Sequence, residues 1–202
     1  MKYMTEQLLE GLHNQAEKQI SNAITDWQQL PYEMLIASPG PGRWSAIQCL
    51  EHLNSYGRYY LPQIKKAIQA NQDKSPSQSF KSGWLGNYFY SLMNLPNDGK
   101  PARKMQSPKN HQPAPFPDPS VVMHEFISQL ETLGMLIMQA KNVDLNQVKV
   151  PISIATFIKL KLGDVFLFYT AHISRHMAQA ERALGTWREQ EYPMLKNMVK
   201  TA

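Results

Sequence analysis

The stretch PGRWSAIQCLEHL, residues 41–53, marks the start of a helix on which the fold depends. Ser45 is followed three residues later by Gln48, the spacing of a capping box, in which each side chain binds the other residue's backbone N–H. Apolar residues then recur at helical spacing, at Ile47, Leu50, Leu53, Leu61, Ile64 and Ile68. This pattern predicts a long amphipathic helix that is capped by Ser45 and buries one face.

Three other segments show the same helical periodicity. The first covers residues 5–30 and is followed by SPGPG at 38–42, which interrupts the helical pattern. The other two cover about residues 119–141 and 163–184, and Asp118 and Pro119 are typical of a helix cap and first helical residue. Four amphipathic helices without convincing strands predict an all-α fold, a four-helix bundle.

A long irregular insertion, at about residues 71–119, separates the second and third helices. Its SGWLGNYFYSLMNL segment, residues 82–95, predicts a short aromatic helix, whereas residues 97–119 are proline-rich and show no periodicity. A loop of this length is usually functional or mobile, but a tolerated surface insertion explains it equally well. The connection is long enough for a crossover, so consecutive helices need not be antiparallel neighbours.

The chain length of 202 residues suits one domain, with a short tail from about residue 185. The single cysteine, the absence of a signal peptide and apolar runs no longer than VFLFY, residues 165–169, predict a cytoplasmic protein without a membrane span. The net charge of +5 is spread over the chain, so we expect no nucleic-acid partner. The aromatic segment exposes apolar surface, which is covered either in a homodimer or by folding back over the chain's own site.

The last predicted helix contains HISRH, with His172 and His176 one turn apart. Residues four apart on a helix lie on one face, so both imidazoles can bind one metal ion. The motif alone is weak evidence, but its face borders the buried stripe through Phe168 and Val165. Buried imidazoles need hydrogen bonds or a metal, and a third ligand has to come from another helix.

His52 in CLEHL is the candidate for that third ligand, because its helix face continues through Gln48, Ser55, Tyr56 and Tyr59. Such a polar and aromatic seam is typical of a pocket wall, although a lone core histidine bonded to a tyrosine is the alternative. The remaining histidines fit less well. His13 is expected to be partly exposed, His111 lies in the proline-rich loop, and His124 lies on a polar helix side.

PGRWSAIQCLEHL and the later HISRH together resemble the DinB-like family, including its YfiT-type members. In that family a tryptophan opens the second helix, a histidine follows at the HL position, and HxxxH on the last helix completes a metal site. The resemblance covers about residues 5–184 and implies that His52, His172 and His176 are the metal ligands. The long insertion departs from the family pattern, which leaves the shape of the pocket and the substrate class open.

Three neutral imidazoles leave a divalent ion with its full charge and an open position, the layout of a catalytic site. Imidazole ligands suit zinc or nickel, and also iron or copper. The resemblance implies a metal-dependent hydrolase or a thiol S-transferase that uses a low-molecular-weight thiol such as bacillithiol, mycothiol or glutathione on a small-molecule substrate. The alternative is a non-catalytic helical protein that binds a small molecule or a partner, with a structural metal or none.

Two tyrosines, two carboxylates and a cysteine also lie near these motifs in the sequence. Tyr56 and Tyr59 are candidates for contacts with a cofactor or substrate, although tyrosines there more often fill the core. Glu51 and Asp164 are the nearest acidic residues in the sequence, and neither is assigned as a general base. Cys49 lies in an apolar helix turn without a cationic neighbour, which predicts a buried and inert thiol.

Overall fold

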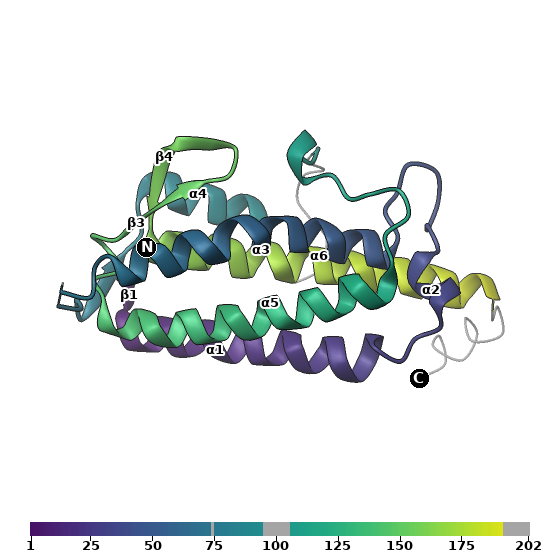
Figure 1. Ribbon diagram of the computed structural model, residues 1–202, viewed down its shortest axis with the longest axis horizontal. Coiled ribbons are helices and arrows are strands. Elements are labelled where there is room, and N and C mark those ends of the chain that lie inside the picture. The colour runs from purple at the N-terminus through teal and green to yellow at the C-terminus, as the bar shows by residue number, and fades with distance from the viewer. Residues whose placement is uncertain (74, 95–105, 192–202) are drawn as a thin grey trace.

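A bundle of four long helices dominates the computed structural model, which describes residues 1–73, 75–94 and 106–191 (Figure 1). The helices are α1 (Thr5–Asn22), α3 (Ala46–Gln69), α5 (Pro119–Gln139) and α6 (Leu162–Glu191). Their apolar faces form one core, in which Leu50, Leu133 and Phe166 are fully buried. The prediction of an all-α bundle is confirmed.

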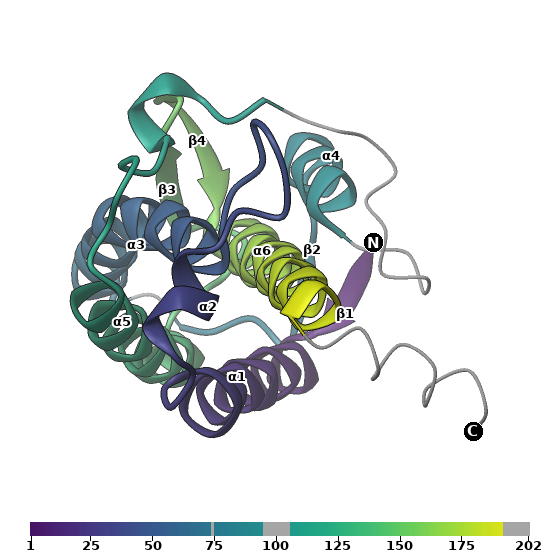
Figure 2. The same ribbon diagram turned by 90° about the vertical axis from the view of Figure 1, so that its right-hand side faces the viewer.

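The helices follow one another around the bundle in the order α1, α5, α3 and α6 (Figure 2). Helix α3 packs on α5 and α6, and α1 packs on the same two helices, so α1 and α3 lie diagonally opposite. Helices α3 and α5 begin at the same end of the bundle (Figure 1). The connection between them therefore crosses the length of the bundle, as its length allows.

Both predicted helix starts are present. The Ser45 hydroxyl accepts a hydrogen bond from the Gln48 N–H (3.3 Å), and Gln48 Oε1 accepts one from the Ser45 N–H (3.0 Å). Asp118 Oδ1 accepts hydrogen bonds from the N–H groups of Ser120 (2.8 Å) and Val121 (3.2 Å). These caps satisfy N–H groups that have no partner within the helix.

The connection contains the predicted aromatic helix, α4 (Trp84–Met93), which packs along α6. Its start is held by Asp164 of α6, which accepts hydrogen bonds from the Ser82 hydroxyl (2.6 Å) and the Gly83 N–H (3.1 Å). Gly86 allows this approach, because a Cβ at that position would lie 2.1 Å from the Asp164 carboxyl carbon. The connection also holds β2 (Ser79–Lys81) and a short 3-10 turn, η2 (Lys109–His111).

The expectation of no strands is wrong. β1 (Lys2–Met4) pairs with β2, and β3 (Lys149–Ile152) pairs with β4 (Ala155–Lys161), both antiparallel. Both sheets have two strands in the part of the chain that the structure describes. The strands are short and half exposed, so their side chains carry little periodic signal. The β3–β4 hairpin packs against α3 and α6 beside the bundle.

Two predicted helix bounds are also wrong. The first helix does not continue to residue 30, because its last turn becomes the π-helix η1 (Ala23–Trp27), followed by the short helix α2 (Tyr32–Ile36). The last helix continues beyond residue 184 to Glu191, since Leu184 is buried and Trp187 packs against the core. The tail from residue 192 and the loop at residues 97–105 lie outside the described residues.

One helical stretch, Pro119–Asn142, is long and apolar enough to cross a membrane by length and composition alone. It comprises α5 and the 3-10 turn η3 (Ala140–Asn142), and α5 packs against α1 and α3 within the bundle. A buried helix of a bundle has the same composition, so this stretch is weak evidence for a membrane span.

Candidate metal centre

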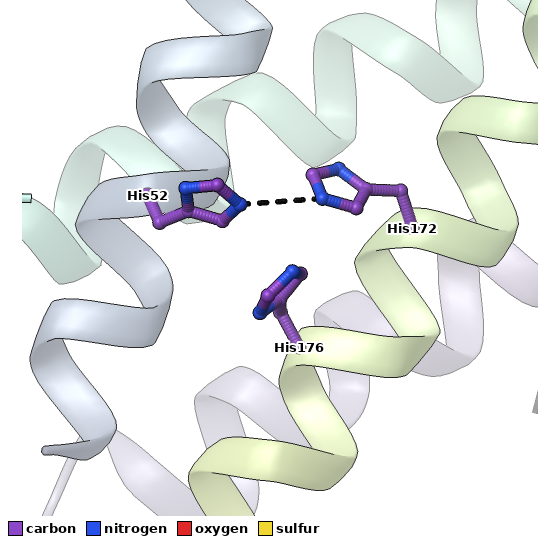
Figure 3. Close-up of side chains that lie close together, drawn as sticks. All are labelled: His52, His172 and His176. Carbon is purple, nitrogen blue, oxygen red and sulfur yellow. Dashed lines mark hydrogen bonds between the residues drawn. The ribbon is translucent and has the colours of Figure 1, made fainter. Parts of the chain in front are cut away.

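The structure brings His52 of α3 together with His172 and His176 of α6 (Figure 3). Each residue offers one ring nitrogen, and these three atoms all lie within 4.8 Å of one another. His52 Nε2 and His172 Nε2 are 3.3 Å apart, and the ring of His176 lies 4.4 Å from that of His52. The three histidines predicted as metal ligands are therefore one cluster between two neighbouring helices.

All three imidazoles are held in their neutral form by burial. His52 and His172 are buried, and His176 is half-buried. Burial lowers the pKa of His52 from 6.5 to about 4. Burial also lowers the pKa of His172 and of His176 well below the usual value. His176, His52 and Arg175 assist for His172, and His52 and Arg175 assist for His176. Neutral imidazoles keep a nitrogen lone pair that can bind a metal ion.

Aromatic rings enclose this cluster. The Trp44 ring lies 4.9 Å from the His52 ring, and the Phe168 ring stacks on His172 at 5.8 Å. The Tyr56 ring lies 5.0 Å from His52 and 4.4 Å from His172. Trp44 stands just before the α3 cap, so the same local sequence that starts the helix also supplies a wall of the site.

His111 belongs to the same site, although its place in the proline-rich loop gave no sign of this. Its backbone carbonyl accepts a hydrogen bond from His52 Nδ1 (2.6 Å), and its ring stacks on Tyr56 with centroids 3.8 Å apart. The side chain is buried, and its Nδ1 lies 3.0 Å from the Ser55 hydroxyl. No periodicity links residue 111 to α3, so only the folded chain reveals the contact.

The other candidate residues lie elsewhere. The Tyr59 hydroxyl donates a hydrogen bond to the Ile152 carbonyl (3.2 Å), toward the β3–β4 hairpin. Glu51 forms an ion pair with Arg58 (2.8 Å), and the Asp164 carboxylate holds the start of α4. Cys49 is fully buried, and burial raises the pKa of its thiol to about 12, so the thiolate does not form near neutral pH.

The remaining histidines lie outside the cluster. His13 is half-buried beside Glu17, and His124 is exposed on α5. Arg175, between the two histidines of HISRH, is a buried residue that the sequence analysis did not single out. It donates a hydrogen bond to the Leu92 carbonyl (3.1 Å) and thereby ties α6 to the end of α4.

The cluster fits a divalent metal ion. Two nitrogens bound to a tetrahedral zinc ion at about 2.0–2.1 Å lie about 3.3 Å apart, which is the separation of His52 Nε2 and His172 Nε2. In one respect the fit is incomplete: Nδ1 of His172 and Nδ1 of His176 are buried without a hydrogen-bond partner among the described residues. Metal-binding histidines usually donate their second N–H to an oxygen, as His52 does to the His111 carbonyl.

A model of the DinB superfamily matches residues 7–180 of the chain. The chain belongs to the DinB superfamily. The match covers the four bundle helices up to residue 180 and includes all three clustered histidines. No curated protein and no solved structure matches the chain significantly.

Proposed function

We propose that this protein is a metal-dependent enzyme that acts on a small molecule, with thiol transfer ahead of hydrolysis. The observation that carries the proposal is the convergence of three neutral histidines, two buried and one half-buried, to which no fourth His, Cys, Asp or Glu is added within the described residues. Structural zinc sites are closed by four protein ligands, whereas catalytic sites have three and an open position. Zinc and nickel are the favoured ions, because both accept imidazole ligands.

The site would hold the ion through His52, His172 and His176. A divalent ion bound by neutral ligands supplies the charge that lowers the pKa of a coordinated water or thiol, and so generates a nucleophile near neutral pH. Trp44 and Phe168 exclude water from two sides of the histidines. Tyr56, which contacts His52 and His172, is the tyrosine placed to touch a bound thiol or substrate.

Tyr59 has a weaker case, because its hydroxyl is already bonded to the Ile152 carbonyl. A substrate contact from Tyr59 would need that hydrogen bond to be exchanged. No general base is assigned, since the carboxylates of Glu51 and Asp164 are engaged with Arg58 and with the start of α4. A thiol bound to the ion would be deprotonated outright, whereas bound water would reach a pKa of only about 7, which is one reason to place thiol transfer first.

The proposal is tested with a panel of thiols, including bacillithiol, mycothiol and glutathione, and the electrophile monochlorobimane. Zinc-loaded and nickel-loaded wild type are compared with His172→Ala, and ester substrates test hydrolysis in parallel. We expect turnover by the loaded wild type and at least a 100-fold loss in the variant. Exposed His124→Ala is the matched control and should retain activity. Turnover that survives His172→Ala would refute the metal mechanism.

The alternative is a helical protein that binds a small molecule or a partner without catalysis. The discriminating measurement is the coordination of the loaded ion by X-ray absorption spectroscopy. A shell of three histidine nitrogens and one exchangeable oxygen supports the enzyme, whereas a closed shell of protein ligands supports the structural role. Absence of turnover with every thiol and ester would also favour the binding protein.

We also propose a homodimer, with α4 as its interface. Trp84 is 81% exposed and Tyr88 is 52% exposed on this helix, which is a large apolar contribution to one surface. The other face of α4 is already used against α6, where Phe89 lies 6.0 Å from Phe168. A second copy of the chain is a partner that would cover the exposed face.

A further inference from the structure

The hydrogen bonds around His52 fix the position of its proton. A carbonyl oxygen accepts hydrogen bonds and does not donate them, so the 2.6 Å contact with the His111 carbonyl requires a proton on His52 Nδ1. A neutral imidazole carries one proton, so a proton on Nδ1 leaves none on Nε2. Its Nε2 therefore bears the lone pair and points toward His172. His111 thus sets the tautomer in which His52 can bind a metal through Nε2.

The same reasoning fixes the proton of His111. The Ser55 hydroxyl lies 2.7 Å from the His52 carbonyl, a contact between two oxygens that needs the hydroxyl hydrogen between them. This leaves the hydroxyl oxygen to accept from His111 Nδ1 (3.0 Å). In a neutral ring, the proton on Nδ1 leaves a lone pair on Nε2. That Nε2 is buried and has no hydrogen-bond partner among the described residues, in a residue that is 3% exposed. An unpaired acceptor at this depth is costly unless a ligand completes it.

His111 stands beside the three histidines and does not join them. It is not part of the group whose ligand atoms lie within 4.8 Å of one another, so it is not placed as a fourth ligand. Its ring covers Tyr56, which itself contacts His52 and His172. The imidazole of His111 therefore lies against the ring that borders the cluster.

The chain around His111 contacts α3 on both sides, because the Ser107 hydroxyl also lies 3.4 Å from His52 Nδ1. The Ser107 hydroxyl lies 3.3 Å from the His111 carbonyl, and the Gln48 amide donates hydrogen bonds to the carbonyls of Ala114 (3.3 Å) and Pro115 (3.1 Å). Gln48 is also the second partner of the capping box. The start of α3 therefore holds the segment that carries His111 over the site.

We propose that His111 is a further residue of the site: its carbonyl orients His52, and its Nε2 accepts a hydrogen bond from an N–H or O–H group of the ligand at the metal. This inference rests on the proposed metal centre for the ligand contact, but not for the tautomers. The chemical class it selects is a small molecule with a hydrogen-bond donor next to its metal-binding atom.

The first experiment tests the tautomers and needs neither metal nor activity. Proton–nitrogen correlation NMR on the full chain labelled with ¹⁵N-histidine distinguishes Nδ1–H from Nε2–H rings, with His111→Asn used to assign the His111 signals. We expect both His52 and His111 as Nδ1–H tautomers. An Nε2–H tautomer for His111 would overturn the inference.

The second experiment tests the ligand contact in the cobalt(II)-loaded protein. Acetohydroxamate, which binds metals through oxygen and keeps an N–H, is compared with azide, which carries no proton. His111→Asn keeps a donor for Ser55 and loses the acceptor, whereas the amide oxygen of His111→Gln reaches toward the Nε2 position. We expect His111→Asn to weaken acetohydroxamate binding about tenfold and azide binding less than twofold, with partial recovery in His111→Gln.

Equal loss of both probes would show that His111 only shapes the site, and would overturn the inference. Failure of the wild type to bind cobalt would contradict the proposed metal centre, and the NMR result would still decide the orientation of His52 by His111. If the ligand-field bands of bound cobalt shift in His111→Asn as they do on loss of a nitrogen ligand, His111 binds the metal directly. That result would also overturn the inference.

Discussion

Acid should destabilise the metal-free protein through its buried histidines, and the effect can be sized for His52. Its pKa is about 4 in the folded protein and 6.5 in an unfolded chain. Below pH 6.5, His52 is therefore protonated in the unfolded chain but stays neutral in the folded protein. The free energy of unfolding falls as the pH falls, because the unfolded chain binds more protons. At about 1.4 kcal/mol per pKa unit, His52 alone accounts for a loss of about 2 kcal/mol at pH 5 and about 3 kcal/mol near pH 4.

The assay is urea unfolding followed by circular dichroism, in the presence of a chelator, at intervals between pH 7.5 and 5. This range lies above the ordinary pKa values of carboxyl groups, which removes most of their contribution. His172 and His176 act in the same direction, because burial lowers their pKa as well. In His52→Leu, the loss of unfolding free energy between pH 7.5 and pH 5 should be smaller than in the wild type by about 2 kcal/mol. Exposed His124→Leu is the matched control and should leave the slope unchanged.

A slope that is the same in wild type and His52→Leu would refute this reasoning, because His52 would then not be held neutral by the fold. Saturating zinc should raise the stability at pH 7.5, since an ion that binds only the folded chain stabilises it by mass action. The stabilisation should disappear as the pH falls and protons compete for the ligand nitrogens.

Three further predictions concern other parts of the chain. Cys49 should react with a thiol reagent at least 100-fold more slowly in the native protein than in urea, because the buried thiol has a pKa of about 12; equal rates would contradict its burial. Gly86→Ala should lower the free energy of unfolding by about 1–3 kcal/mol, measured by urea unfolding, because the new methyl group overlaps Asp164. Gly11→Ala is the control, since nothing lies within 4 Å of its Cβ, and it should stabilise α1 by about 0.5–1 kcal/mol. Light scattering should show that Trp84→Glu converts a dimer to a monomer, and a monomeric wild type would contradict the proposed interface.

The parts of the fold that could be predicted are those that local chemistry determines. The capping box of Ser45 and Gln48 and the Asp118 cap depend on residues three positions apart or fewer. The spacing of these residues in the sequence is therefore enough to predict the caps. The long helices follow from periodicity over many turns. The π-helical turn at Ala23–Trp27 was missed because its residues keep the helical pattern, with Ala23 and Trp27 buried four positions apart. The β3–β4 hairpin was missed because it depends on packing against α3 and α6.

In the candidate site, too, the local sequence predicts some positions and not others. His172 and His176 are placed together by one helical turn, which any helix at that position would produce. His52 needed the resemblance to a family as well as its own helix face, because nothing local relates residue 52 to residue 172. His111 carried no signal at all, since its place depends on a crossover that spans the bundle and on the hydrogen bonds of Ser55 and Gln48 to that segment.

The long insertion therefore contributes residues to the site, which its composition did not indicate. The crossover is required by topology, because α3 and α5 begin at the same end of the bundle (Figure 1). A chain that must return along the bundle passes the start of α3, where Gln48 binds it and where His52 and Trp44 also lie. One short stretch, RWSAIQCLEH, thus caps the helix and contributes His52 to the cluster. The same stretch supplies the Trp44 ring beside the cluster and, through Gln48, binds the segment that carries His111. We expect changes at Gln48 to affect ligand affinity more than metal affinity, because Gln48 holds the covering segment and touches none of the three clustered histidines through a hydrogen bond in the described chain.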